Sequence, residues 1–169
     1  MQGGDDVNLK KAKLFWKLGC LEKCIHCLPY DDNQDFYSFL RNQYQAGYRQ
    51  IIITSDIMIH LLTMLFLSNY TLTDIQFAEE DPDLELDVKL LISNANKDHT
   101  LFVDLIERLN FVAENSSIDI QKISFIGRDQ NSVAVNGYVQ SNGILAINNS
   151  AFESISQKIC TQVKRCLFW

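Results

Sequence analysis

The strongest hydrophobic pattern lies in residues 117–169, where short apolar runs alternate with turn residues before the spacing becomes helical. Asn142-Gly143 separates two of these runs. This dipeptide favours a two-residue type I′ turn, because both central residues of that turn need positive φ. With such a turn, Tyr138 faces Ile147 across the hairpin. The pattern predicts three consecutive strands followed by a helix.

The closing helix has a recognisable start and one apolar side. Ser150 and Glu153 have the spacing of a capping box, in which each side chain satisfies a backbone N–H at the start of a helix. The apolar positions that follow have helical spacing: Phe152, Ile155, Ile159, Val163 and Cys166. This helix can cover one face of the sheet. Apolar side chains occur on both faces, so the second face needs cover from the rest of the chain or from a partner.

The N-terminal part of the chain predicts two helices. Within residues 7–28, five apolar residues have the four-three spacing typical of one helical face: Leu14, Leu18, Leu21, Ile25 and Leu28. Pro29 ends this helix. A second helix is predicted over residues 34–46, with Gly47 just beyond its end. Together they predict a helical hairpin over residues 1–48.

The middle of the chain predicts the remaining strands and two further helices. Strands are expected at residues 50–54, 71–77, 84–92 and 118–126, and helices at 57–67 and 98–114. The strand at 84–92 is predicted by its alternation of apolar and polar side chains. A change of phase between Ile120 and Ile123 indicates a bulge or a break. The apolar helix at 57–67 is too short to span a bilayer, which takes about 20 residues.

These elements predict a single α+β domain over residues 1–169. A helical hairpin, residues 1–48, precedes an antiparallel five- or six-stranded sheet with helices packed on it, residues 49–169. The 169 residues are 47% apolar, which is enough for a sizeable core. The net charge of −6 and the pI near 5.0 argue against a general nucleic-acid or anionic-membrane binder, because such proteins need basic faces.

The cysteine content and the first residues bear on the compartment. Five cysteines, an odd number, favour reduced thiols over a framework of disulfides. Residues 1–6 are polar and acidic, and no apolar run of a secretory signal follows a basic segment. We therefore expect a cytoplasmic or nuclear protein in a reducing environment, with no membrane span, no nucleic-acid partner and no bound cofactor.

From Thr71 onward, the predicted order is strand, strand, helix, strand, strand, strand, helix. This order is similar to the core of longin and roadblock modules, in which a five-stranded antiparallel sheet carries helices. With the helix at residues 57–67 in front, the order is most similar to the roadblock arrangement. The resemblance implies a non-catalytic scaffold that pairs through its sheet edge or helices and serves trafficking or small-GTPase complexes.

Cys20, Cys24 and Cys27 are the main candidates for metal chemistry. Their C-x3-C-x2-C spacing resembles the cluster-binding loop of radical S-adenosylmethionine enzymes, in which three thiolates would hold a 4Fe–4S cluster. A metal or iron–sulfur enzyme is therefore an alternative function, and a zinc site that includes His26 is another form of it. The same spacing also places the cysteines on one helical face, where Cys packs as a small hydrophobe. We prefer this packing interpretation.

Other polar residues offer a further alternative. Asp74, Asp87 and Lys89 have the layout by which some Mg²⁺-dependent nucleases hold the metal and orient water. The polar positions of an amphipathic strand explain the same residues without catalysis. His60 lies in an apolar segment and is expected to be a hydrogen-bonded core histidine. The acidic run at residues 79–83 is expected to be a solvated loop, with docking of a basic partner as the alternative.

The sequence therefore predicts a non-catalytic binding or scaffolding subunit of a multiprotein complex rather than an enzyme. Both faces of its final sheet are apolar, and the apolar residues 166–169 would fray unless another chain buried them. The expected contact surface combines Tyr138, Leu167, Phe168 and Trp169 with the apolar stripe of the first helix. A protein partner or a second copy of the chain is expected to occupy this surface.

Overall fold

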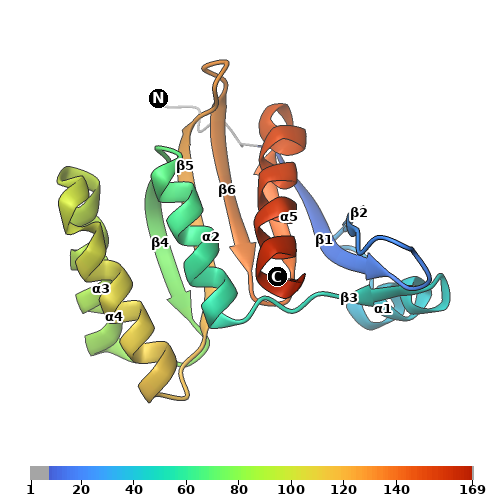
Figure 1. Ribbon diagram of the computed structural model, residues 1–169, viewed down its shortest axis with the longest axis horizontal. Coiled ribbons are helices and arrows are strands. Elements are labelled where there is room, and N and C mark those ends of the chain that lie inside the picture. Colours follow the sequence, from blue (N-terminus) through green and yellow to red (C-terminus); the bar gives the residue numbers. More distant parts are fainter. Residues whose placement is uncertain (1–7, 169) are drawn as a thin grey trace.

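The computed structural model describes residues 8–168 as an antiparallel sheet with helices packed on it and at its ends (Figure 1). The strands are β1 (Leu9–Lys17), β2 (Ile25–Pro29), β3 (Tyr48–Gln50), β4 (Thr71–Phe77), β5 (Ile120–Arg128), β6 (Ala134–Gln140) and β7 (Ile144–Asn148). The helices are α1 (Phe36–Gln45), α2 (Ser55–Leu67), α3 (Pro82–Lys97), α4 (Phe102–Asn115) and α5 (Phe152–Phe168). The predicted α+β class is confirmed.

Six strands of the sheet follow the order β2-β1-β7-β6-β5-β4, the short β3 pairs with β1 beside this path, and each pairing is antiparallel. Strand β1 therefore lies inside the sheet, next to a strand from the other end of the sequence. It pairs with β7 through residues 9–13 and with the short β3 through residues 15–17. The edges of the sheet are β2 and β4.

The helices divide between one face of the sheet and its two ends. Helices α2 and α5 lie across one face, and α3 and α4 form a pair beyond β4 (Figure 1). Helix α1 lies beside β3 at the opposite end. The core between the sheet and the helices includes Leu62, Leu65, Phe125, Val139 and Ile159. No helix within residues 8–168 is both long enough and apolar enough to cross a membrane.

The β6–β7 hairpin forms where it was predicted, but its turn is different. The turn has three residues, 141–143, and the Gly143 N–H donates to the carbonyl oxygen three residues earlier (3.0 Å). Gly143 has a φ of +80°, whereas Asn142 has no positive φ. This geometry is a type I turn followed by a glycine bulge, rather than a type I′ turn. The predicted register is therefore wrong by one residue, and Tyr138 faces Ala146.

The predicted N-terminal helical hairpin over residues 1–48 is wrong, because the described chain begins with the β-hairpin β1–β2. Gly19, with a φ of +79°, turns the chain inside the range predicted as a helix. Leu14 is buried in β1, whereas Leu21 is fully exposed in the loop, so the leucines do not share one face. All side chains from Ala12 to Phe15 are buried. Burial on both sides of β1 removes the alternation that usually identifies a strand.

The second predicted helix exists as α1, whose N-cap Asp35 accepts a hydrogen bond from the Ser38 N–H. Val7, the expected start of the first helix, lies outside the described residues. The first unit of the chain is therefore a β-hairpin, one helix and a short third strand.

The predicted strand at residues 84–92 is also wrong, because these residues belong to α3. The Asp81 carboxylate accepts a hydrogen bond from the Leu84 N–H (3.1 Å), and Pro82 occupies the first turn, where proline is favoured. The buried side of the helix is formed by Leu84, Val88, Ile92 and Ala95. Leu86 and Leu90, which completed the alternating pattern, lie on the exposed side instead.

Residues 50–54, predicted as a strand, belong to one only at Gln50. The segment beyond it runs between β1 and the β6–β7 turn. The Ile51 N–H donates to the Leu14 carbonyl (3.1 Å), and the Ile53 N–H donates to the Ser141 carbonyl (2.8 Å). These residues therefore connect the N-terminal unit to the final hairpin.

The remaining predicted elements are present with small differences in their boundaries. Helices α2, α4 and α5 and strands β4 and β5 overlap the ranges predicted for them. The irregularity expected between Ile120 and Ile123 is confirmed as a register shift in the β4–β5 pair. The predicted stripe on α5 is buried at Phe152, Ile155, Ile159 and Val163, and half-buried at Cys166.

Candidate protein-binding face

Helices α3 and α4 carry four large apolar side chains that are exposed to solvent, Leu86, Leu90, Val103 and Phe111. Val103 is 54% exposed and lines a separate hollow with Phe66 and His99, whereas the other three are on α3 and the outer side of α4. The exposed fractions are 71% for Leu86, 60% for Leu90 and 57% for Phe111. Leu86 and Leu90 lie one helical turn apart, on the side of α3 opposite to its buried stripe. A surface helix normally presents charged or polar side chains at such positions. These three residues therefore need an explanation.

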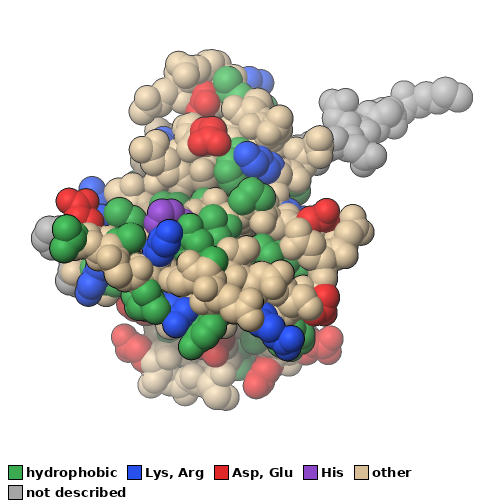
Figure 2. Space-filling model, turned by 90° about the vertical axis from the view of Figure 1, so that its right-hand side faces the viewer, with side chains coloured by type: hydrophobic (Ala, Val, Ile, Leu, Met, Phe, Trp, Pro, Cys, Tyr) green, Lys and Arg blue, Asp and Glu red, His purple; other side chains and the backbone are tan. Residues whose placement is uncertain are grey.

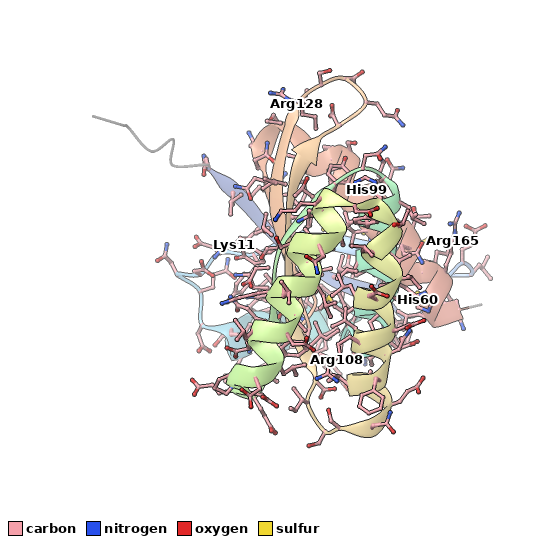
Figure 3. The ribbon with its side chains drawn as sticks, turned by 90° about the vertical axis from the view of Figure 1, so that its left-hand side faces the viewer. Lys11, His60, His99, Arg108, Arg128 and Arg165 are labelled. Carbon is pink, nitrogen blue, oxygen red and sulfur yellow. The ribbon has the colours of Figure 1, made fainter. Side chains whose placement is uncertain are left out.

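The two helices are joined on this side by an ion pair. The Asp87 carboxylate accepts a hydrogen bond from Arg108 Nε (2.8 Å), and the Arg108 guanidinium lies 5.9 Å from the centre of the Phe111 ring. Figure 3 shows Arg108 at the pair of helices, on the side of the molecule that lies beyond β4. We define the hairpin face as the exposed surface formed by Asp83, Leu86, Asp87, Leu90, Glu107, Arg108 and Phe111. The α3 part of this face borders a shallow hollow of about 600 Å³, which Lys89 also lines.

The hairpin face belongs to the most acidic part of the chain. Residues 71–119 contain twelve Asp and Glu side chains against three Lys and Arg, whereas the rest of the chain contains nine against twelve. Part of this acidity has a local role, because Asp81 caps α3 and Asp83 and Glu85 lie in its first turn, where negative charge suits the helix dipole. Glu107 lies beyond the first turn of α4, so the dipole does not account for it.

The residues predicted as a contact surface do not form one continuous surface. Tyr138 lies on the face of the sheet opposite to α5, because it alternates with the buried Val139 of β6. Its ring lies 4.1 Å from Lys122 Nζ. Leu167 and Phe168 are at the end of α5, where Lys23 Nζ lies 4.7 Å from the Phe168 ring. Trp169 lies outside the described residues.

The three N-terminal cysteines occupy different environments. Cys20 is exposed in the β1–β2 loop, Cys24 is half-buried near the end of that loop, and Cys27 is half-buried in β2. Within residues 8–168, no three His, Cys, Asp or Glu side chains are grouped closely enough to hold a metal ion. Cys27 instead approaches Cys160 of α5. The hydrogen bond with Cys160, together with burial, raises the pKa of the Cys27 thiol above its ordinary value.

Alkylation of the native protein with iodoacetamide should modify Cys20 before Cys27. Thiolates are the reacting species, so burial and a raised pKa both slow Cys27, by roughly tenfold or more relative to Cys20. Peptide mass spectrometry of timed samples measures the order. Equal rates at Cys20 and Cys27, or joint protection of Cys20, Cys24 and Cys27 that a chelator removes, would contradict this expectation.

The structure does not bring the three residues of the nuclease alternative together at one site. Asp74 is on β4, whereas Asp87 and Lys89 are on α3 rather than on a strand. Asp87 pairs with Arg108 of α4, whereas Lys89 and Asp74 line a groove between α3 and β4. Lys89 also lines the hollow beside Asp87, but Asp74 does not, and Asp87 is engaged by Arg108.

The three histidines lie in different environments, and His60 differs from its prediction. His60, predicted to be in the core, is exposed on α2, with Nε2 4.0 Å from an Asp56 carboxylate oxygen. His99 contacts the Phe66 ring at the start of the turn that leads into α4. His26 is half-buried in β2, and its Nε2 has no hydrogen-bond partner within the described chain.

The alternating pattern concealed the hairpin face, because it places Leu86 and Leu90 at the inward positions of a strand. Two signals in the sequence favoured a helix instead. Asp81-Pro82 is a typical helix start, and Leu84, Val88 and Ile92 recur every four residues. On that interpretation Leu86 and Leu90 remain as apolar residues on the outer side. No family model, no curated protein and no solved structure matches this chain.

Proposed function

We propose that the protein is a non-catalytic binding subunit that holds a basic amphipathic helix of a partner protein on the hairpin face. The observation that carries this proposal is the exposure of Leu86, Leu90 and Phe111 on two adjoining helices. These helices are linked by the Asp87–Arg108 ion pair and belong to the most acidic part of the chain. The proposal retains the predicted scaffolding role and assigns it to a different surface.

Burial of the three apolar side chains would drive the association. A large apolar side chain contributes about 1.5–3 kcal/mol when it passes from full exposure to full burial. More than half of each of these side chains is available for burial against a partner. Single exposed leucines are common on protein surfaces, but neighbouring ones with a polar rim are typical of interaction sites.

The shape of the face favours a helical partner. Two packed helices present a groove between their ridges, and a third helix fits such a groove with apolar side chains spaced three and four residues apart. One such stripe would cover Leu86, Leu90 and Phe111 together. Lys or Arg side chains on its flanks would lie near Asp83 and Glu107, and opposite charge at the rim speeds association and selects partners.

Selection from a displayed library of random helical peptides tests this partner chemistry. We expect the enriched peptides to be basic, with apolar residues at helical spacing, and to bind more weakly as the salt concentration rises. The double variant Leu86→Asp with Leu90→Asp should lose at least about tenfold in affinity, as expected when central apolar contacts are removed. Both side chains are exposed, so the fold should be retained.

Leu21→Asp is the matched control, because Leu21 is a fully exposed leucine in the β1–β2 loop, outside the hairpin face. Its affinity for the selected peptides should equal that of the wild type. Enrichment of acidic peptides, or equal affinity of the wild type and the double variant, would contradict the proposal. Circular dichroism of each variant verifies that the helices are intact.

A further inference from the structure

A second concave site lies at the other end of the molecule, between α1 and β3. This cavity has a volume of about 360 Å³ and is lined by Phe15, Leu40, Arg41, Tyr44, Tyr48, Arg49 and Gln50. Most of the lining is apolar or aromatic, and its charged members are both arginines. Small-molecule sites in proteins have this character, with a mainly apolar wall and a few placed polar groups.

Arg49 is held in place by its neighbours. Its guanidinium carbon lies 3.6 Å from the centre of the Tyr44 ring, and its Nη1 donates to the carbonyl oxygens of Tyr48 (2.9 Å) and Tyr44 (3.3 Å). A guanidinium carries five N–H donors, so donors remain for a ligand. The stacking fixes the plane of the group, which reduces the entropy lost when it binds an anion.

The charge around the cavity is positive, although the protein as a whole carries a net charge of −6. Lys17 Nζ lies 5.3 Å from the Tyr48 ring, which adds a third cation to Arg41 and Arg49. Within the described residues, none of the three forms a salt bridge with a carboxylate. Asp35 is a carboxylate near Arg41, but its hydrogen bonds come from the Ser38 N–H (2.9 Å) and hydroxyl (2.7 Å) at the start of α1.

Figure 2 shows the end of the molecule that carries α1 and β3, where Lys and Arg side chains border hydrophobic side chains across the middle of the surface. We infer that the cavity binds a small ligand that combines a planar aromatic ring with a phosphate group. The apolar and aromatic lining buries the ring. Arg41 and Arg49 donate to the phosphate oxygens, a geometry for which arginine is well suited. This inference does not depend on the proposed function of the hairpin face.

Amide NMR of the full chain, titrated with phenyl phosphate, tests the inference. We expect shifts at Tyr44, Tyr48 and Arg49 that saturate at millimolar concentration or below. Inorganic phosphate and phenol, which each supply half of the ligand, should bind at least about tenfold more weakly, because each omits one of the two interactions. Adenosine 5′-monophosphate is the fourth probe. If it binds more tightly than phenyl phosphate, the ligand class is a nucleotide; if not, it is a phosphorylated benzene ring.

Arg49→Gln should weaken phenyl phosphate binding by about tenfold or more, since charge-assisted hydrogen bonds are lost. Arg41→Gln is the second variant; Arg41 is exposed, so we expect its substitution to leave the fold intact. Arg128→Gln, in the β5–β6 hairpin, is the control and should bind as the wild type does. Absence of saturable shifts, equal binding of inorganic phosphate or phenol, or unchanged affinity in both cavity variants would overturn the inference.

Discussion

Gly143→Ala should lower the free energy of unfolding by about 2–4 kcal/mol, the sum of strain at positive φ and overpacking. Gly143 has a φ of +80°, and a Cβ at this position would lie inside the van der Waals contact distance of the Ile51 carbonyl oxygen. That oxygen cannot move away easily, because hydrogen bonds hold the backbone on both sides of it. The Ile51 N–H donates to the Leu14 carbonyl of β1, and the Ile53 N–H donates to the Ser141 carbonyl of the turn. Urea denaturation measures the loss.

Gly47→Ala is the matched control for this substitution. Gly47 has a φ of +89°, but nothing lies within 4 Å of a Cβ added there. Only the strain at positive φ applies, so we expect a loss of about 1 kcal/mol. Equal losses for the two variants would show that the turn does not touch the Ile51 segment as the structure has it.

Lys13→Met should stabilise the protein at pH 7 by roughly 1–2 kcal/mol, because it removes a buried charge. Lys13 has no exposed surface, and its Nζ donates to the Asn142 carbonyl between the Phe15 and Phe36 rings. Burial lowers the pKa of Lys13 from 10.5 to about 8. The shift means that the charged form of Lys13 costs the folded state roughly 3 kcal/mol of stability. Lys13→Met removes this cost, but it also loses the hydrogen bond to Asn142, which offsets about 1 kcal/mol of the gain.

The pH dependence follows from the same shift in the pKa of Lys13. Between pH 8 and 10.5 the unfolded chain keeps the Lys13 proton and the folded chain loses it, so Lys13 makes stability rise with pH in this range. The advantage of Lys13→Met should therefore be largest at and below pH 7 and shrink toward pH 10.5. Urea denaturation at several pH values compares the two proteins.

Lys11→Met supplies the control, two residues away on the same strand. The Lys11 ammonium donates a hydrogen bond to the Asp32 carboxylate, and this hydrogen bond raises the pKa of Lys11. Removing its charge should therefore not stabilise the protein at pH 7. A destabilisation of more than about 1 kcal/mol on Lys13→Met, or an advantage that does not change with pH, would contradict the burial of a charged amine at this position.

The C-terminal part of the fold could be predicted from local patterns. The strands, the hairpin near Asn142-Gly143 and the apolar stripe of α5 are encoded by residues close together in the sequence. Even here the turn type was wrong, because the three-residue turn depends on contacts of Gly143 with the distant Leu14, whose N–H donates to the Gly143 carbonyl (2.9 Å). Local patterns contain no information about that contact.

The N-terminal part could not be predicted in the same way. Strand β1 is buried on both faces and pairs with β7, which lies more than a hundred residues further along the chain. Its sequence therefore lacks the alternation of a half-exposed strand, and its buried Lys13 looks like a surface residue. The leucine spacing predicted a helix with Leu21 on its buried face, whereas Leu21 is fully exposed in the structure.

The candidate site illustrates a different limit. Leu84 to Ile92 alternates as a strand does, yet every fourth residue also fits one helical face, and the capped start at Asp81-Pro82 favours the helix. The helix leaves Leu86 and Leu90 exposed, and these are the residues on which the proposed function depends. The same ambiguity that misled the secondary-structure prediction therefore concealed the interaction surface.

The measurement that tests the proposed function most directly is amide and methyl NMR of the full chain, titrated with a basic amphipathic peptide from the selection. The largest shifts are expected at Leu86, Leu90 and Phe111 and at their neighbours on α3 and α4. Shifts centred instead on Tyr138 or on the end of α5 at Leu167, or spread over the molecule without saturation, would contradict the assignment of the hairpin face as the binding surface.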